Sequence, residues 1–254
     1  VACGAALALI SCMTVPDTNR QDIVLISPSQ EKQLGLTSFE KIKAEKAISN
    51  DAALNAQLQR VGRRLQQVIR MPNAEWEFVV FDDSTPNAFA LPGGKVGVHT
   101  GLFQITRDDA GLAAVVGHEI AHVVARHGAQ RMSRQTIAAV GAAALGVALE
   151  RDEELSSERK AAILGAYGAG VTAGAILPYS RAQEIEADQL GALYMARAGY
   201  DPRESIALWR RFAQYRSTTG EATKIAFLST HPTDAARINA LEGYMPRAMD
   251  EFRS

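Results

Sequence analysis

The sequence predicts an α+β fold that is mostly helical, with a small sheet beside one buried helix. Three observations point to this class: an amphipathic helix at residues 51–70, short alternating segments at residues 76–99, and long helical segments over most of the remaining chain. The chain has 254 residues, of which 47% are hydrophobic, so it can bury a sizeable core. We expect one large domain at residues 49–254, preceded by two appended segments.

The first appended segment is predicted at residues 1–12, "VACGAALALISC", a short apolar run of small residues. It is typical of the last part of a signal peptide, and "LISC" resembles the lipobox of bacterial lipoproteins, in which Cys12 would be acylated. The alternatives are an ordinary cleaved signal or a frayed apolar terminus. Residues 13–48 are polar, contain Pro and Ser and show little periodicity, so they are predicted to form a tether.

The predicted domain begins with a helix and a small sheet. Apolar residues recur in alternating steps of four and three from Leu54 to Val68, which indicates an amphipathic helix over residues 51–70. "WEFVVFDD" at residues 76–83 alternates and favours a strand. In "NAFALPGGKVGVHTGLF", which follows, Pro92, Gly93 and Gly94 predict a turn between two short strands.

The stretch "VVGHEIAHVVARHGAQR" at residues 115–131 contains three of the five histidines of the chain. On a helix, His118 and His122 lie one turn apart on the same face and can bind one metal ion, while Glu119 can reach a water on that ion. The alternative is a pair of surface histidines, but the apolar flanks predict a buried helix whose polar side chains need partners. His127 would lie off this face on an unbroken helix and is not expected to be a ligand.

Two Ala/Gly-rich stretches follow, Gln135 to Leu149 and Ala161 to Leu177, on either side of the charged segment "ERDEELSSERK". Each is shorter than the roughly 20 residues that a membrane span needs, so a packed helical hairpin is favoured over a transmembrane pair. Further helices are predicted at residues 201–216, where Asp201 and Pro202 would start the helix, and from Thr233 onward.

A catalytic zinc usually has three protein ligands, so one more His, Asp or Glu is required. No acid occurs between Glu119 and Glu150, and the ligand must therefore come from further along the chain. In "YSRAQEIEADQLGALYMARAGY", Glu184 and Asp188 share a helix face, whereas Glu186 points roughly 160° away. Two acids one turn apart suit a metal ligand and a carboxylate that receives the ring N–H of a ligand histidine. The alternative is a solvated acidic face, and Glu186 is expected to tolerate alanine.

Taken in their order along the chain, "NAFALPGG", "HEIAHVVARH", "SRAQEIEAD" and "STHP" resemble the gluzincin family of zinc metallopeptidases that includes the CAAX prenyl endopeptidases, HtpX, the mitochondrial Oma-type protease and bacterial periplasmic lipoprotein proteases. The likeness covers roughly residues 50–245. It implies one Zn²⁺ per chain, bound by His118, His122 and Glu184. It also implies that Glu119 is the general base and that Asp188 orients a ligand histidine.

The resemblance assigns further residues to substrate binding and catalysis. The edge strand beside the cleft would bind an extended peptide through Asn87, Ala88, Phe89, Ala90 and Leu91. His231 would lie near the zinc, where it either stabilises the oxyanion or occupies the open coordination position, and Arg237 would stabilise charge. The alternative for His231 is a purely structural place before Pro232 at the entry to a helix.

The implied function is that of a zinc-dependent endopeptidase that cleaves misfolded or misassembled cell-envelope proteins. The implied location is the bacterial periplasm, with the lipid anchor in a membrane, the outer membrane being favoured. The alternative is an envelope chaperone or assembly factor whose zinc site is structural or rarely active. A structural site would more often close its coordination with Cys or a fourth side chain, and would have no use for Glu119. The net charge of −1 and the lack of a basic stripe predict no nucleic-acid partner.

Overall fold

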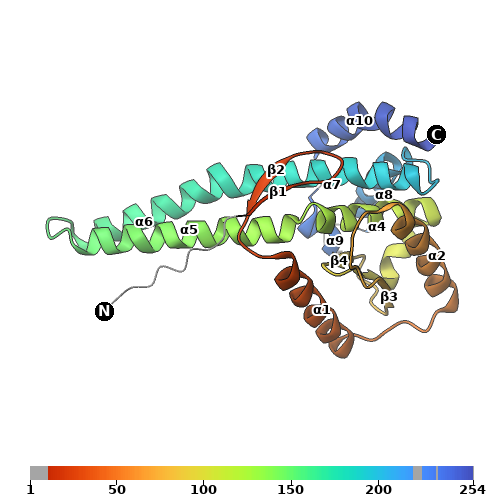
Figure 1. Ribbon diagram of the computed structural model, residues 1–254, viewed down its shortest axis with the longest axis horizontal. Coiled ribbons are helices and arrows are strands. Elements are labelled where there is room, and N and C mark those ends of the chain that lie inside the picture. The colour runs from red at the N-terminus through yellow and green to blue at the C-terminus, as the bar shows by residue number, and fades with distance from the viewer. Residues whose placement is uncertain (1–10, 220–224, 233, 254) are drawn as a thin grey trace.

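Two helices packed side by side organise the fold, α4 (Asp109–Val124) and α7 (Leu177–Arg197) (Figure 1). The chain is described here from a computed structural model, over residues 11–219, 225–232 and 234–253. The two helices approach closely because each contributes a glycine at the contact. A Cβ atom on Gly191 would lie only 2.9 Å from the backbone nitrogen of His118. A larger side chain would separate the helices, so the glycine contact brings the acids of α7 next to the histidines of α4.

A three-stranded sheet lies beside α4, and the fold is α+β and mostly helical as predicted. Its strands are β3 (Glu77–Phe81), β4 (Ala88–Leu91) and β5 (Lys95–His99), in the order β3-β5-β4. β5 is parallel to β3 and antiparallel to β4, so β4 is an edge strand. The predicted turn joins β4 to β5, and Gly93 and Gly94 adopt φ values of 92° and 86° there, which favour glycine.

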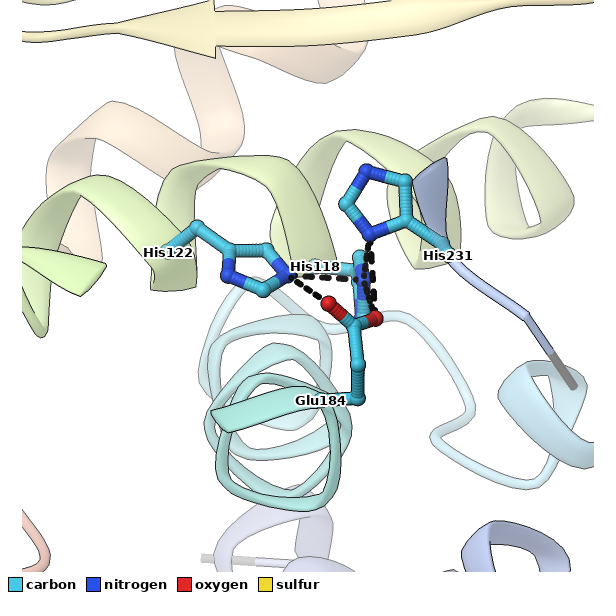
Figure 2. Close-up of side chains that lie close together, drawn as sticks. All are labelled: His118, His122, Glu184 and His231. Carbon is cyan, nitrogen blue, oxygen red and sulfur yellow. Dashed lines mark hydrogen bonds and ion pairs between the residues drawn. The ribbon is translucent and has the colours of Figure 1, made fainter. Parts of the chain in front are cut away.

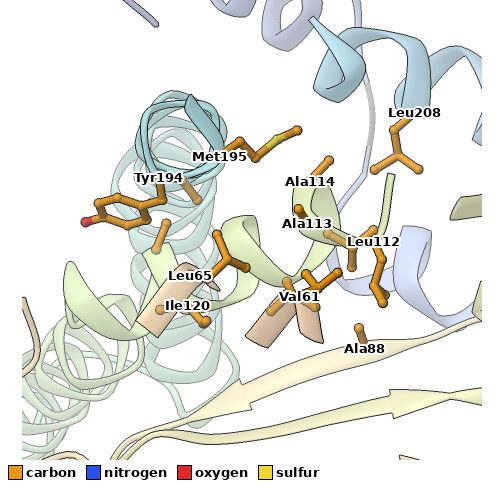
Figure 3. Packing of buried hydrophobic residues seen from close by; sticks show 14 of the residues in the cluster. Val61, Leu65, Ala88, Leu112, Ala113, Ala114, Ile120, Tyr194, Met195 and Leu208 are labelled. Carbon is orange, nitrogen blue, oxygen red and sulfur yellow. The ribbon is translucent and has the colours of Figure 1, made fainter. Parts of the chain in front are cut away.

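Helix α2 (Ala52–Val68) covers α4 and β3 with its apolar face. Asp51 begins the helix by accepting hydrogen bonds from the backbone N–H groups of Ala53 and Leu54. Figure 3 shows Val61 and Leu65 of α2 in the same apolar cluster as Leu112 of α4. This core fixes α4 between α2, the sheet and α7.

Residues 13–48 do not form the expected tether. They contain the antiparallel strands β1 (Ser11–Thr14) and β2 (Gln21–Val24), followed by helix α1 (Pro28–Glu45). Strands of four residues are too short to show a clear alternation. The segment is held by buried apolar side chains such as Val15 and Phe39, and by polar contacts with distant residues such as that between Glu31 and Arg126 (2.6 Å). Residues 1–10 of the predicted signal segment lie outside the described residues, whereas the backbone of Cys12 pairs with Ile23 in this hairpin.

The two Ala/Gly-rich stretches form helices α5 (His127–Glu150) and α6 (Ser157–Val171), which pair as a hairpin that projects from the body (Figure 1). A π-helical turn, Thr172–Ile176, continues α6 into α7. Tyr167 donates a hydrogen bond to the carbonyl oxygen of Ala138 (3.3 Å) across the hairpin. Within the described residues, α5 is the one helix whose length and composition would suit a membrane crossing, and 6% of its apolar window is buried.

The chain ends in helices α8 (Glu204–Thr219), α9 (Ala226–Thr230) and α10 (Ala235–Arg253), while two short helical turns, Thr100–Leu102 and α3 (Phe103–Thr106), link β5 to α4. α8 begins three residues later than predicted, because Asp201 and Pro202 form the preceding turn. α10 packs against α7 (Figure 1). The segment between α9 and α10 carries His231 and reaches the histidines of α4.

Candidate active site

Four buried side chains converge between α4, α7 and the segment after α9: His118, His122, Glu184 and His231 (Figure 2). One nitrogen or oxygen atom of each lies within 4.8 Å of the others. The Nε2 atom of His118 is 3.1 Å from Nε2 of His122 and 3.4 Å from Oε2 of Glu184. Nδ1 of His231 is 3.3 Å from Nε2 of His118 and 3.0 Å from Oε2 of Glu184.

These separations suit a tetrahedral metal site. Zinc binds histidine nitrogens and carboxylate oxygens at about 2.0–2.2 Å, which places the ligand atoms of a tetrahedron roughly 3.3–3.6 Å apart. The observed separations of 3.0–3.4 Å between donor atoms are close to this range. Against the effect of burial, the three histidines lower the pKa of Glu184 well below its usual range. The group therefore presents one carboxylate and three imidazoles, a donor set that zinc prefers.

The other ring nitrogen of His118 faces an acid. Its Nδ1 atom lies 3.0 Å from Oδ1 of Asp188, which places Asp188 where the sequence expected an orienting carboxylate. Burial alone would lower the pKa of His118, but contacts with Asp188 and Glu184 outweigh it and raise the pKa to about 9. The Asp188 carboxylate beside Nδ1 favours a proton at that nitrogen, and Nε2 is left to face the other donors.

Arg237 holds Asp188 in place. Its Nε and Nη2 atoms donate to the two carboxylate oxygens of Asp188 at 2.8 Å and 2.9 Å, and Nη1 donates to the carbonyl oxygen of Pro232 at 2.9 Å. The guanidinium also stacks on Trp209, 4.3 Å from the ring centroid, and is almost fully buried. These contacts suit a residue that positions Asp188 and the His231 segment. Nη1 also lies 3.2 Å from Oε2 of Glu184, and the role of Arg237 as a charge stabiliser stays a prediction.

His122 has an indirect carboxylate partner that the sequence analysis missed. Arg126 adopts a left-handed conformation (φ 56°, ψ 34°), so α4 ends and α5 starts at His127 with a change of direction. The ring of His127 is thereby turned back toward the site, and its Nδ1 atom lies 2.8 Å from Nδ1 of His122. Its Nε2 atom lies 2.9 Å from Oε2 of Glu186. The residue that takes the left-handed conformation is an arginine and Gly128 lies inside α5, so the sequence does not place the break before His127.

The expectation that Glu186 tolerates alanine is inconsistent with these contacts. Glu186 does point away from Glu184, but its carboxylate is buried and accepts hydrogen bonds from Arg20 (2.7 Å) and Thr18 (2.7 Å) of the N-terminal hairpin. Although burial opposes it, hydrogen bonds from His127, Arg20 and Thr18 lower the pKa of Glu186 to about 2. The sequence could not reveal this role because both hairpin partners lie more than 160 residues away along the chain.

The proton positions in this chain of contacts follow from the donor geometry. Nε2 of His122 faces the cluster, so metal binding there requires the proton on Nδ1. That proton is then donated to Nδ1 of His127, whose own proton must be on Nε2 and is donated to Glu186. The chain from His122 through His127 to Glu186 therefore fixes one tautomer of His122.

Replacing His127 with alanine is expected to weaken zinc binding by about tenfold or more, because the orientation and tautomer of His122 are no longer fixed. The measurement is competition with a chromogenic chelator. His99→Ala is the control, since it removes another buried histidine whose ring bonds the carbonyl oxygen of Thr85 instead. Equal zinc affinity in both variants would contradict a positioning role for His127.

Glu119 lies on α4 between the two histidines of that helix and is buried. Its Oε1 atom is 3.3 Å from Nε2 of His231 and has no hydrogen-bond partner within the part of the chain that the structure describes. A buried carboxylate oxygen without a hydrogen bond, next to a cluster of metal donors, can accept a proton from a water molecule.

The predicted peptide-binding residues lie at the sheet edge next to α4. Ala88, Phe89, Ala90 and Leu91 form β4, and the carbonyl oxygen of Asn87 accepts a hydrogen bond from the backbone of His99 (2.9 Å). α9 contacts the start of this strand, where the backbone N–H of Phe227 donates to the carbonyl oxygen of Pro86 (3.2 Å). The first part of β4 is therefore tied to the short helix that precedes His231.

The histidine pair on α4, Glu184 on the neighbouring helix α7 and the edge strand beside α4 are typical of a metallopeptidase domain. The chain belongs to peptidase family M48, whose family model matches residues 52–245. The family predicted by the resemblance is thus confirmed.

Relatives occur in mitochondria and in bacteria. The chain is 34% identical over 92% of its length to the "Mitochondrial metalloendopeptidase OMA1" of Schizosaccharomyces pombe, of which the match covers 66%. It is 32% identical over 93% of its length to a "Putative beta-barrel assembly-enhancing protease" of Vibrio cholerae, with 48% of that protein covered. The corresponding protease of Escherichia coli K12 is 29% identical over 90% of the chain, with 46% covered. The chain thus spans about half to two thirds of the length of these relatives.

Proposed function

We propose that this domain is a zinc-dependent endopeptidase, with His118, His122 and Glu184 as the metal ligands and Glu119 as the general base. The observation that carries the proposal is the buried group of four converging donors with the Glu119 carboxylate beside it. Membership of peptidase family M48 supports the same activity. The direct test is cleavage of casein with and without a chelator: activity that is lost with the chelator and restored by zinc supports the proposal, and no activity in zinc-loaded protein overturns it.

The chemistry is divided between the metal and the side chains of the chain. A zinc ion held by these ligands would polarise the scissile carbonyl group and acidify a water molecule. The Glu119 carboxylate accepts a proton from the attacking water and passes it to the leaving amine, so that the peptide bond is replaced by an acid and an amine. Asp188 keeps Nε2 of His118 directed at the donor cluster, and Arg237 holds Asp188 in that position.

β4 would present the substrate. An edge strand can form main-chain hydrogen bonds with an extended peptide, and such bonds tolerate varied side chains. A peptide added along Ala88 to Leu91 would pass beside α4 and its two histidines. Broad sequence tolerance suits a protease that acts on unfolded chains.

His231 would close the site in a resting state. Its Nδ1 atom lies with the three proposed ligand atoms, in a place suited to a fourth ligand, while its Nε2 atom lies beside Glu119. An oxyanion donor would instead need a free N–H directed at substrate. The geometry therefore favours a role for His231 as a plug, a side chain that occupies the coordination position required by the catalytic water.

His231→Ala is accordingly expected to raise turnover severalfold, provided that each preparation contains one zinc ion per chain. Loss of an oxyanion donor would instead lower turnover by about a hundredfold. Steady-state cleavage of a quenched fluorescent peptide distinguishes the two signs. Thr230→Ala, on the exposed side of α9, is the control for local damage to this segment.

The substrates we propose are misfolded or misassembled proteins of the bacterial cell envelope. Two of the relatives carry "beta-barrel assembly-enhancing protease" in their names, which supports an envelope location. The same names give some support to a second candidate, an assembly factor or chaperone whose metal site is rarely active. Catalytic turnover that survives in purified, zinc-loaded protein would separate the protease from this candidate.

The proposed location is the periplasm, with a lipid on Cys12 as the membrane anchor. If "LISC" directs acylation, Cys12→Ser is expected to move the protein from the membrane fraction to the soluble fraction and to abolish incorporation of labelled palmitate. Membrane attachment without the label would point to the projecting α5–α6 hairpin instead, because its outer face exposes Ile137, Val140 and Val147.

A further inference from the structure

A cavity of about 600 Å³ lies at the far end of the proposed peptide-binding strand. Five separate parts of the chain line it: Met13 of β1, the start of α1, Met71 after α2, Pro92 and Gly93 after β4, and Val124 at the end of α4. These residues are distant in sequence and enclose the space only in the folded chain. The N-terminal hairpin, which the sequence analysis treated as a tether, therefore forms one wall.

Of the charged side chains in the cavity wall, Glu31, Lys32 and Arg126 are paired, and Arg70 is exposed to solvent. Glu31 and Arg126 form an ion pair at 2.6 Å, and Arg126 also donates to the carbonyl oxygen of Ile26 at 2.7 Å. The ammonium group of Lys32 is bound to Glu75 (2.7 Å) and to a backbone carbonyl oxygen. Most of the remaining lining is apolar, including two methionines, which adapt to varied apolar shapes. The cavity therefore suits an apolar side chain better than a charged one.

The position of the cavity relative to β4 determines which part of a peptide would reach it. The start of β4 is tied to α9, which leads to His231, whereas Pro92 and Gly93 directly follow its end. On α4, Val123 and Val124 directly follow His122 and also line the cavity. The cavity thus continues the edge strand beyond the donor cluster, on the side away from α9.

We propose that this cavity is a specificity pocket for a large apolar side chain of the substrate, located on the N-terminal side of the cleaved bond. The proposal rests on the proposed endopeptidase function. Antiparallel pairs are the commoner arrangement, and a peptide antiparallel to β4 has its N-terminal residues next to the end of that strand. At about 3.3 Å per residue, the four positions preceding the cleaved bond cover the distance from the middle of β4 to the cavity.

Such a pocket would select unfolded substrates. Large apolar side chains are mostly buried in folded proteins, and they become accessible when a chain misfolds or fails to assemble. Main-chain hydrogen bonds to β4 do not distinguish between side chains. A requirement for a large apolar side chain before the cleaved bond would therefore add a preference for unfolded substrates.

The test uses peptides in which one leucine is moved through the four positions before and the four positions after a single cleaved bond, with serine elsewhere. Wild-type protein is expected to cleave one of the upstream-leucine peptides about tenfold faster, in kcat/KM, than the peptides with leucine downstream. Met71→Lys and, from a different wall, Met13→Lys should each remove this preference. Met132→Lys, at an exposed position of α5, is the matched control and should retain it.

Binding measurements keep this proposal separate from the proposed function. The same peptides are titrated into Glu119→Gln protein, alone and combined with Met71→Lys, and followed by fluorescence anisotropy. If wild-type protein cleaves nothing, but the leucine peptides still bind more tightly than an all-serine peptide and this difference is lost with Met71→Lys, the proposed function fails and an apolar pocket is supported. A preference for downstream leucine, or one that survives both pocket variants in correctly folded protein, overturns the pocket.

Discussion

Glu119→Gln is expected to lower peptide cleavage by at least about a hundredfold while one zinc ion per chain stays bound. Glutamine has nearly the same shape as glutamate but cannot accept the proton of the attacking water. The change leaves the proposed ligands His118, His122 and Glu184 intact. Turnover of a quenched fluorescent peptide and zinc content by mass spectrometry, measured on the same preparation, test both parts of the expectation.

Because Glu119 also contacts His231, a second variant is needed to separate the loss of the base from the loss of this contact. Oε1 of Glu119 lies 3.3 Å from Nε2 of His231, so removal of the negative charge also weakens one contact that holds His231 in the site. If Glu119 is the base, the Glu119→Gln/His231→Ala double variant stays inactive although the proposed plug is gone. Activity in the double variant would show that Glu119 is not the base, because the carboxylate and the proposed plug are then both absent. Glu158→Gln, at an exposed position on α6, is the control for the substitution itself.

The periodicity of the sequence was sufficient to predict the helices and strands in the central part of the fold. The heptad-like steps from Leu54 to Val68, the strand residues before Asp83 and the Pro-Gly-Gly turn correspond to α2, β3 and the β4–β5 connection. Each of these signals depends on residues close together in sequence, where helix and strand periods are directly visible. The side-chain spacing within α4 and α7 likewise singled out His118, His122 and Glu184, whereas His231 was reached only through the family resemblance.

The contacts around the donor cluster could not be predicted from sequence periodicity, because they join residues that are brought together only by the tertiary structure. A single left-handed residue, Arg126, turns His127 back toward His122, and an arginine at this position gives no signal of a break in the sequence. Glu186 looked free because its partners Arg20 and Thr18 lie more than 160 residues away in sequence. The cavity wall formed by Met13 was hidden for the same reason, since the hairpin is held by distant partners and not by its own periodicity.

The choice between Glu184 and Glu186 as the metal ligand has a clear thermodynamic signature. A metal that binds only the folded state raises the melting temperature, so zinc should stabilise any variant that keeps its ligands. Glu184→Ala is expected to lose this zinc-dependent rise and to bind zinc at least about a hundredfold more weakly, because one of three proposed ligands is gone. Differential scanning calorimetry with and without zinc, together with chelator competition, measures both quantities.

Glu186→Ala should give a different pattern, which makes it the matched comparison. Its loss leaves the Arg20 guanidinium without one of its carboxylate partners and frees the Nε2 proton of His127, so the melting temperature should fall in the absence of zinc as well. The zinc-dependent rise should remain, reduced only to the extent that His122 loses its orientation. If zinc stabilised neither variant, or if Glu184→Ala retained the full rise, the carboxylate that binds the metal would have to be sought elsewhere. The buried Asp188 would then be tested next, through Asp188→Asn.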